Sequence, residues 1–104
     1  MQKAIDEIRR FNRERDWEQY HTPQALARSI SIEAGELLEC FQWSDEYDRA
    51  HVLEELADVA TYCVDMADAL GVSLEDIILD KMEKNKAKYP VEKARGSSKK
   101  YDQL

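Results

Sequence analysis

Two acidic pairs constrain the fold of this chain more than any other feature. The first pair is Glu33 with Glu36, and the second is Glu55 with Asp58. Residues three positions apart lie on the same face of a helix, so each pair predicts a helix with two neighbouring carboxylates. Two such helices packed against each other would bring four carboxylates together.

The first pair does not lie on a solvated helix face. At about 100° per residue, Glu33 falls between Ile30 and Leu37 in the apolar stripe of its helix, and Glu36 lies at the edge of that stripe. A carboxylate in an apolar stripe is costly unless it is paired or bound to a metal. The second pair has an aromatic, Tyr62, one turn further along its own flank. Both pairs are therefore candidates for a metal site.

The rest of the chain is also predicted to be helical. Three Gly and two Pro leave few residues that break helices. In the third helix the expected core stripe is Val52, Leu56, Val59, Cys63, Met66 and Leu70. Helical periodicity predicts four helices, over residues 2–15, 23–42, 47–70 and 73–89.

Local signals mark the ends of these helices. Thr22, followed by a proline, is a start signal for the second helix. Ser44 or Asp45 is expected to cap the third helix, and Gly71 is placed to end it. Ser73 is expected to cap the fourth helix.

At 104 residues the chain is expected to form one domain, all-α in class. Residues 1–90 are predicted to form that domain. Residues 91–104 have no periodicity and are predicted to be a flexible tail.

The net charge is −7, which argues against a nucleic-acid polymer or an anionic membrane as the main partner. No apolar run approaches the length of a membrane span. Cys40 and Cys63 form no CxxC motif, which favours two free thiols in a reducing compartment. We therefore expect a cytoplasmic protein.

Three metal chemistries compete for the acidic pairs. A di-iron bundle needs Glu-x-x-His motifs, and neither His21 nor His51 has that spacing from these glutamates. A zinc site favours Cys or His ligands, and those residues are scattered along the sequence. Oxygen-only ligands, with lysines available for phosphate, suit Mg²⁺ acting on a phosphoanhydride.

Six stretches carry a pattern of a known family: residues 15–21 (RDWEQYH), 33–37 (EAGEL), 41–43 (FQW), 54–59 (EELADV), 81–90 (KMEKNKAKYP) and 95–101 (RGSSKKY). With these stretches the sequence resembles the MazG-like nucleoside triphosphate pyrophosphohydrolases, and most closely their dCTP pyrophosphatase branch. The connection after Trp43 is shorter here than in the animal enzymes of that branch, a departure that bears on the shape of the base pocket and on the preferred base.

The resemblance implies hydrolysis of a nucleoside triphosphate, dCTP or a modified dCTP first, to the monophosphate and pyrophosphate. It also implies a four-helix protomer that assembles into a dimer or a tetramer built from dimers. Glu36 is a candidate to accept the proton from the attacking water. By position, the implied Mg²⁺ ligands are Glu33, Glu36, Glu55 and Asp58, the implied base and sugar contacts are Trp17, His21, Trp43 and Tyr62, and the implied phosphate-side residues are Lys81, Asn85 and Lys88.

Other interpretations of the sequence remain open at this point. The substrate could be another nucleotide, such as dUTP or a phosphoribosyl-nucleotide intermediate. The chain could also be a non-catalytic helical module that assembles through its apolar faces and binds metal structurally. Trp17 could simply close the end of a small core, and the lysines could form a solvated helix face that complements the helix dipole.

Overall fold

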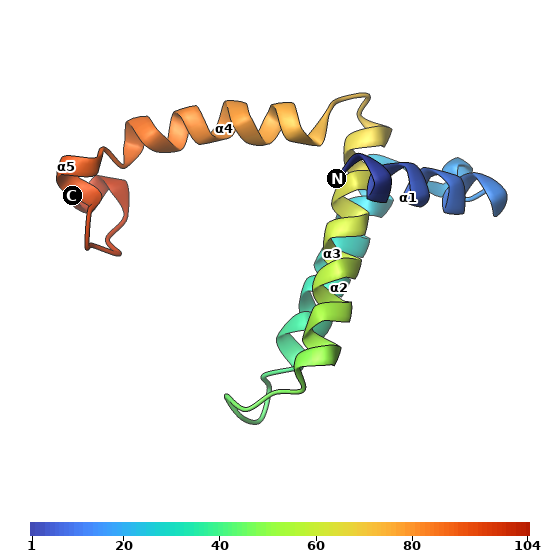
Figure 1. Ribbon diagram of the computed structural model, residues 1–104, viewed down its shortest axis with the longest axis horizontal. Helices are drawn as coiled ribbons and strands as arrows, with labels where there is room; N and C mark the ends of the chain where they lie inside the picture. Colours follow the sequence, from blue (N-terminus) through green and yellow to red (C-terminus); the bar gives the residue numbers. More distant parts are fainter. The chain divides into compact units, whose positions relative to one another are not determined.

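A computed structural model describes residues 1–104 and is helical throughout, with no strand. This confirms the all-α prediction. The chain divides into two compact units, Met1–Val72 and Ser73–Leu104, which are described separately. The first unit contains α1 (Gln2–Glu14), η1 (Glu18–Tyr20), α2 (Pro23–Glu39) and α3 (Arg49–Ala69), and the second contains α4 (Leu74–Lys88), α5 (Val91–Ala94) and η2 (Tyr101–Gln103) (Figure 1).

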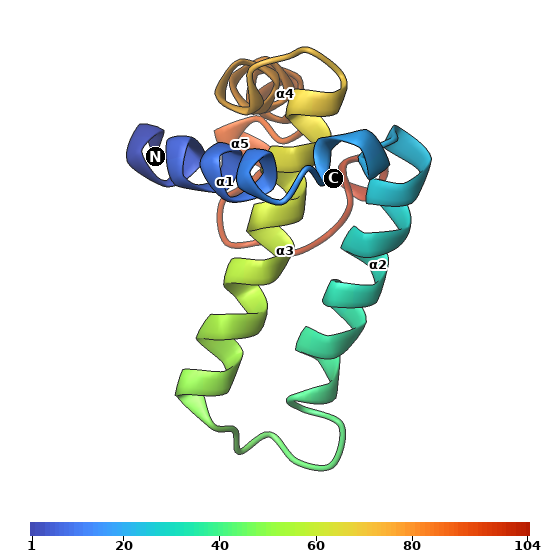
Figure 2. The ribbon, with the colours of Figure 1, turned by 90° about the vertical axis from the view of Figure 1, so that its right-hand side faces the viewer.

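In the first unit, α2 and α3 form an antiparallel hairpin, and α1 crosses α3 near its C-terminal end (Figure 2). The core lies where the three helices meet. Leu26 of α2 is 1% exposed there, and Val64 and Ala67 of α3 are also buried. Farther along the hairpin the predicted core stripe of α3 is open, because two helices cannot cover each other on all sides. Leu56 lies in this open stretch and is exposed. Leu70, the C-cap at the other end of α3, is also exposed, so the prediction that both belong to the core is wrong for a single chain.

The helix ends follow local side-chain chemistry. The hydroxyl of Thr22 accepts a hydrogen bond from the Ala25 amide at 3.1 Å, and Ser73 accepts one from the Asp76 amide at 3.3 Å. Gly71 has φ of +69°, a conformation that glycine adopts without strain. The cap of α3 was predicted wrongly. Asp48 holds that position, with its carboxylate accepting from the Ala50 amide at 3.1 Å, so α3 starts later than expected.

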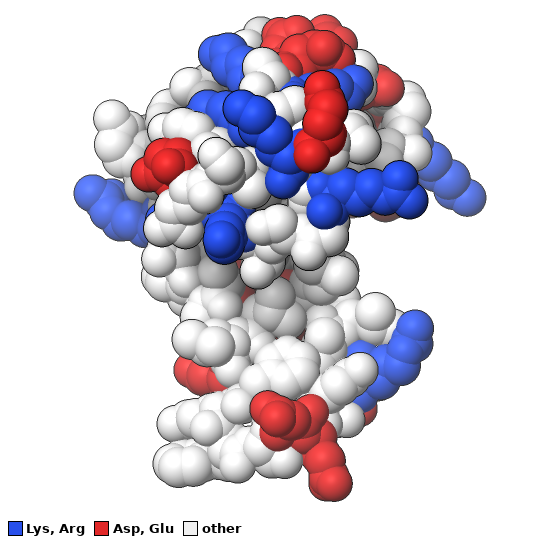
Figure 3. All heavy atoms as spheres, turned by 90° about the vertical axis from the view of Figure 1, so that its left-hand side faces the viewer, with Lys and Arg blue, Asp and Glu red and all other residues white.

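The second unit carries 8 basic and 6 acidic residues. On the face drawn in Figure 3, Lys and Arg side chains lie among Asp and Glu side chains. Lys81 and Lys88 lie on α4 and are exposed, while Asn85 is half-buried on the same helix. The predicted tail contains α5 and η2, and Tyr89 packs edge-on against Tyr101 with ring centroids 6.2 Å apart. No helix of the chain is both long enough and apolar enough to cross a membrane.

Candidate active site

The antiparallel pairing of α2 and α3 brings the two acidic pairs to one place. Carboxylate oxygens of Glu33, Glu55 and Asp58 all lie within 4.8 Å of one another. Glu33 and Glu55 are half-buried, and one oxygen of each, Oε2, is buried without a hydrogen-bond partner. A buried carboxylate oxygen without a partner is costly. The oxygens are therefore arranged for a cation.

Hydrogen bonding, burial and like charge all raise pKa values in this cluster. The neighbouring Glu36 carboxyl, together with burial and the charges of Asp58 and Glu55, raises the pKa of Glu33 to about 7. Burial, and then Glu36, raise the pKa of Glu55 above its ordinary value. Glu36 thus interacts with both α2 and α3 ligand candidates, although its oxygens are not part of the 4.8 Å cluster. The donor set is entirely carboxylate, which fits a hard divalent cation.

The sequence did not reveal that a histidine and a cysteine flank this cluster. Nε2 of His51 lies 3.1 Å from Oε1 of Glu55, and Nδ1 of the same ring lies 3.8 Å from Sγ of Cys40. The two residues are 11 positions apart in the sequence, and the pairing of α2 with α3 brings them together. Because the ring presents its two nitrogens to different partners, His51 orients Glu55 and partly offsets the rise in its pKa. Both cysteines are free thiols, as expected.

A cavity of about 350 Å³ opens beside the cluster and shares Asp58 with it. Its walls come from α1, from the segment around η1 and from α3. Trp17, His21 and Tyr62 line it, and the same three residues line a second cavity of about 290 Å³ against α2. Trp17 is fixed by Phe11, whose ring meets it edge-on with centroids 5.3 Å apart. An apolar cavity with aromatic walls is suited to a flat ring.

Tyr62 connects the cavity to the cluster. Burial, and then the charges of Glu33, Asp65 and Asp58, raise the pKa of its hydroxyl above the ordinary value. The hydroxyl therefore stays protonated at neutral pH and remains a hydrogen-bond donor. The predicted grouping of Trp17, His21 and Tyr62 is present in the structure.

Trp43 is not brought to this group within one chain. It lies in the connection between α2 and α3, at the tip of the hairpin, and is 89% exposed. Lys81, Asn85 and Lys88 belong to the second unit. Their predicted contacts with a substrate stay predictions.

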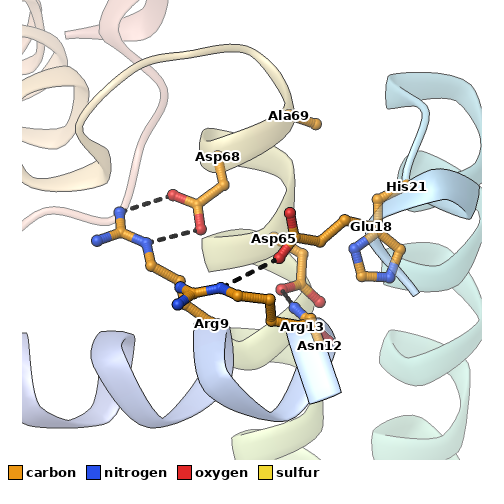
Figure 4. Close-up of a pocket in the computed structure, with 8 residues that line it drawn as sticks. All are labelled: Arg9, Asn12, Arg13, Glu18, His21, Asp65, Asp68 and Ala69. Atoms are coloured by element: carbon orange, nitrogen blue, oxygen red, sulfur yellow. Dashed lines mark hydrogen bonds and ion pairs between the residues drawn. The ribbon is translucent and has the colours of Figure 1, made fainter. Parts of the chain in front are cut away.

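A polar pair buried beside the cavity was missed by sequence reasoning. Asn12 Nδ2 donates to Asp65 Oδ1 at 2.8 Å, and the two residues are 7% and 4% exposed. Next to them, Arg9 forms a two-pronged ion pair with Asp68 (2.8 and 3.0 Å) in a polar pocket of about 400 Å³ (Figure 4). The signal for Asp65 was spacing, because positions 55, 58, 62 and 65 share one face of α3.

Comparison with known proteins shows which family the chain belongs to. A model of the MazG-like family matches residues 28–104. The chain is 39% identical to dCTP pyrophosphatase 1 of Mus musculus and 40% identical to that of Homo sapiens, in each case over 97% of this chain and 68% of the relative. It also matches the crystal structure of a pyrophosphatase from Archaeoglobus fulgidus, with 41% identity, a TM-score of 0.78 and coverage of 86% of this chain and 92% of the other. On these grounds, the chain is a member of the MazG-like family.

Proposed function

We propose that this protein, a nucleotide pyrophosphohydrolase, converts dCTP or a modified dCTP to the monophosphate and pyrophosphate with Mg²⁺. The observation that supports this most is the meeting of two features at Asp58. This residue belongs to the carboxylate cluster and also lines the aromatic cavity. A triphosphate at the cluster would have its base in that cavity.

Three groups of residues have separate roles in the proposed hydrolysis. Glu33, Glu36, Glu55 and Asp58 would hold Mg²⁺, which when bound would neutralise phosphate charge and make water a better nucleophile. Of these four, Glu36 is the residue whose oxygens lie outside the 4.8 Å cluster, so we give it the further role of accepting the proton of the water that attacks the α-phosphorus. Lys81 and Lys88 balance the charge on the departing pyrophosphate, and the Asn85 amide donates a hydrogen bond on the same side.

Trp17 and Tyr62 hold the base by stacking, which any base supports, and His21 closes the cavity beside them. Stacking gives affinity, so selectivity for cytosine depends on polar contacts at the edge of the ring. The cellular role that fits this activity is the removal of surplus or modified nucleotides from the pool, in the reducing environment of the cytoplasm.

We further propose that the working form is a homo-oligomer, a tetramer built from dimers. The hairpin leaves apolar side chains exposed on both helices, among them Ile32, Leu38, Leu53 and Leu56. A soluble monomer rarely exposes so many neighbouring apolar residues. In this assembly Trp43 stacks on the base bound by a second copy. Light scattering coupled to size-exclusion chromatography measures the mass directly, and a monomer that retains full activity would contradict the assembly.

The decisive experiment is a release assay with Mg²⁺ across natural and 5-modified nucleoside triphosphates, with both products identified. Monophosphate plus pyrophosphate, fastest for cytosine nucleotides, is the expected result. Faster turnover of dUTP than of dCTP would support the proposed reaction but would make dUTP the preferred substrate. Release of single phosphates, or no turnover by folded and metal-loaded protein, would contradict the proposed reaction. If the folded, metal-loaded protein hydrolyses no nucleotide, a non-catalytic helical module becomes the better interpretation.

A further inference from the structure

The buried pair formed by Asn12 and Asp65 has a feature that a purely structural pair does not need. Asp65 is 4% exposed, yet no basic side chain forms an ion pair with it. The nearby arginines are engaged by other acids, Arg9 by Asp68 at 2.8 Å and Arg13 by Glu18 at 3.8 Å. His21 lies close enough for its charge to act on the pKa of Asp65, but it forms no ion pair with that carboxylate. Burying a carboxylate without a cation is costly, and an asparagine at the same place could serve Asn12 at lower cost.

The carboxylate also has unused hydrogen-bonding capacity. Asn12 donates to Oδ1, which leaves Oδ2 as an acceptor for a further donor. Asn12 and Asp65 both line the aromatic cavity together with Trp17, His21 and Tyr62. Figure 4 shows Asn12 from α1 and Asp65 from α3 meeting, with His21 nearby. Because the pair lines both this cavity and the polar pocket of Figure 4, Asp65 is placed to offer a ligand an acceptor that its neighbour holds in position.

The position of Asp65 along α3 suits the far edge of a bound nucleotide. It lies seven residues beyond Asp58, which corresponds to about 10 Å along the helix axis. Tyr62 lies between them on the same face. Phosphate at Asp58, the stacked ring beside Tyr62, and the outer edge of that ring at Asp65 then follow one another along a single helix.

We propose that Asp65, held in place by Asn12, is the specificity-determining residue that accepts a hydrogen bond from the exocyclic amino group of a cytosine base. This inference rests on the proposed function. Cytosine presents an N4 amino donor at that edge, and a carboxylate is a suitable acceptor for it. Uracil and thymine present a carbonyl oxygen there, and that oxygen is repelled by a carboxylate. The chain therefore discriminates among pyrimidines by charge and hydrogen bonding.

The test compares Asp65→Asn with Asp68→Asn. The control changes the same chemical group one turn further along α3, outside the aromatic cavity. For each protein, kcat/KM is measured with dCTP and dUTP, and binding is measured with non-hydrolysable analogues of both. We expect Asp65→Asn to lower the ratio of dCTP to dUTP by about tenfold to a hundredfold, in turnover and in binding. Asp68→Asn should leave the ratio unchanged. An active Asp65→Asn enzyme with the wild-type ratio would overturn the inference and leave the proposed reaction standing.

A second measurement needs no variant, in case Asp65→Asn does not fold. The wild-type protein is assayed with N4,N4-dimethyl-dCTP, which has no amino hydrogen, and with 5-methyl-dCTP, which keeps both hydrogens. We expect at least about a tenfold loss of kcat/KM for the first relative to the second. Equal turnover of the two, or a wild-type preference for dUTP over dCTP, would overturn the inference. A protein that hydrolyses no nucleotide at all contradicts the proposed function itself.

Discussion

The two units of this chain differ in the balance and in the burial of their charged residues. The first unit has 16 acidic and 7 basic residues, and the second has 6 acidic and 8 basic residues. The first unit buries part of its charge, in the carboxylate cluster and in the Asn12–Asp65 pair. The second leaves its lysines in solvent and also exposes Ile77, Ile78, Leu79 and Met82 along α4. The first unit thus organises its carboxylates by its own packing, whereas α4 exposes basic and apolar side chains together.

The largest effect that we expect comes from Glu33→Gln in the first unit. It removes a cluster ligand and should lower kcat by at least about a hundredfold. In EDTA the melting temperature should stay equal or rise, because a repelling charge is gone. The rise in melting temperature with Mg²⁺ should disappear. Glu39→Gln, an exposed change at the end of the same helix, is the matched control. Retained activity in Glu33→Gln would remove it from the ligand set.

The aromatic cavity should show the next largest effect. Trp17→Ala removes one stacking face and should weaken nucleotide binding by about tenfold, mainly through KM. Trp17→Phe keeps an aromatic ring against Phe11 and should retain most of the affinity. The two variants are compared by titration with a non-hydrolysable triphosphate. If both lose affinity equally, stacking is not what Trp17 contributes.

The lysines of α4 offer a direct comparison between the units. Lys81→Ala and Lys88→Ala should each lower kcat/KM by several-fold, because each removes a charge that balances the leaving pyrophosphate. The control is Lys86→Ala on the same helix, where the ammonium is engaged by Glu83 at 3.0 Å. Rates measured at two salt concentrations separate a specific contact from general attraction. Equal losses in all three variants would indicate that only the overall charge of the unit matters.

How far the sequence could predict this structure differs between local and distant features. The caps at Thr22 and Ser73 were readable because each depends on a few neighbouring residues. The carboxylate cluster was readable because helical spacing fixes which face each acid occupies. The hydrogen bond from Asn12 to Asp65 could not be predicted, because it joins residues 53 positions apart and depends on how α1 crosses α3.

The wrong prediction that the α3 stripe is buried has a different cause. Periodicity shows which face of a helix is apolar, but not whether the same chain covers that face. Leu56 therefore matched the core pattern and is exposed in one chain. The position of Trp43 was also unreadable, because a connection between helices has no periodicity that fixes its direction.

The raised pKa of Glu33 predicts a pH dependence that is specific to the first unit. Its folded-state pKa of about 7 lies above the unfolded value of 4.5, so the folded state binds more protons between these pH values. The stabilising contribution is complete below pH 4.5 and is lost as the pH rises through 7. In EDTA we expect the melting temperature to fall by a few degrees between pH 5 and pH 8 because of this group.

Bound Mg²⁺ should lower the pKa of Glu33 again, because a cation favours the ionised carboxylate. The rise in melting temperature caused by Mg²⁺ should therefore grow from pH 5.5 to pH 8. Differential scanning fluorimetry with and without Mg²⁺ measures both trends, and Glu33→Gln should flatten them. A metal effect independent of pH would mean that Glu33 is already ionised in the metal-free protein.

The smallest effect should come from the two helix caps, which make the same kind of hydrogen bond in the two units. Thr22→Ala and Ser73→Ala each remove a side-chain acceptor, and each should cost about 1 kcal/mol of helix stability. Because α2 carries Leu26 into the core, loss of its cap should lower the global melting temperature. Because α4 packs little apolar surface of its own, loss of its cap should instead increase amide hydrogen exchange along α4 and leave the first unit protected. Equal loss of protection in both units after Ser73→Ala would show that they unfold as one cooperative body, which a stable oligomer covering α4 would produce.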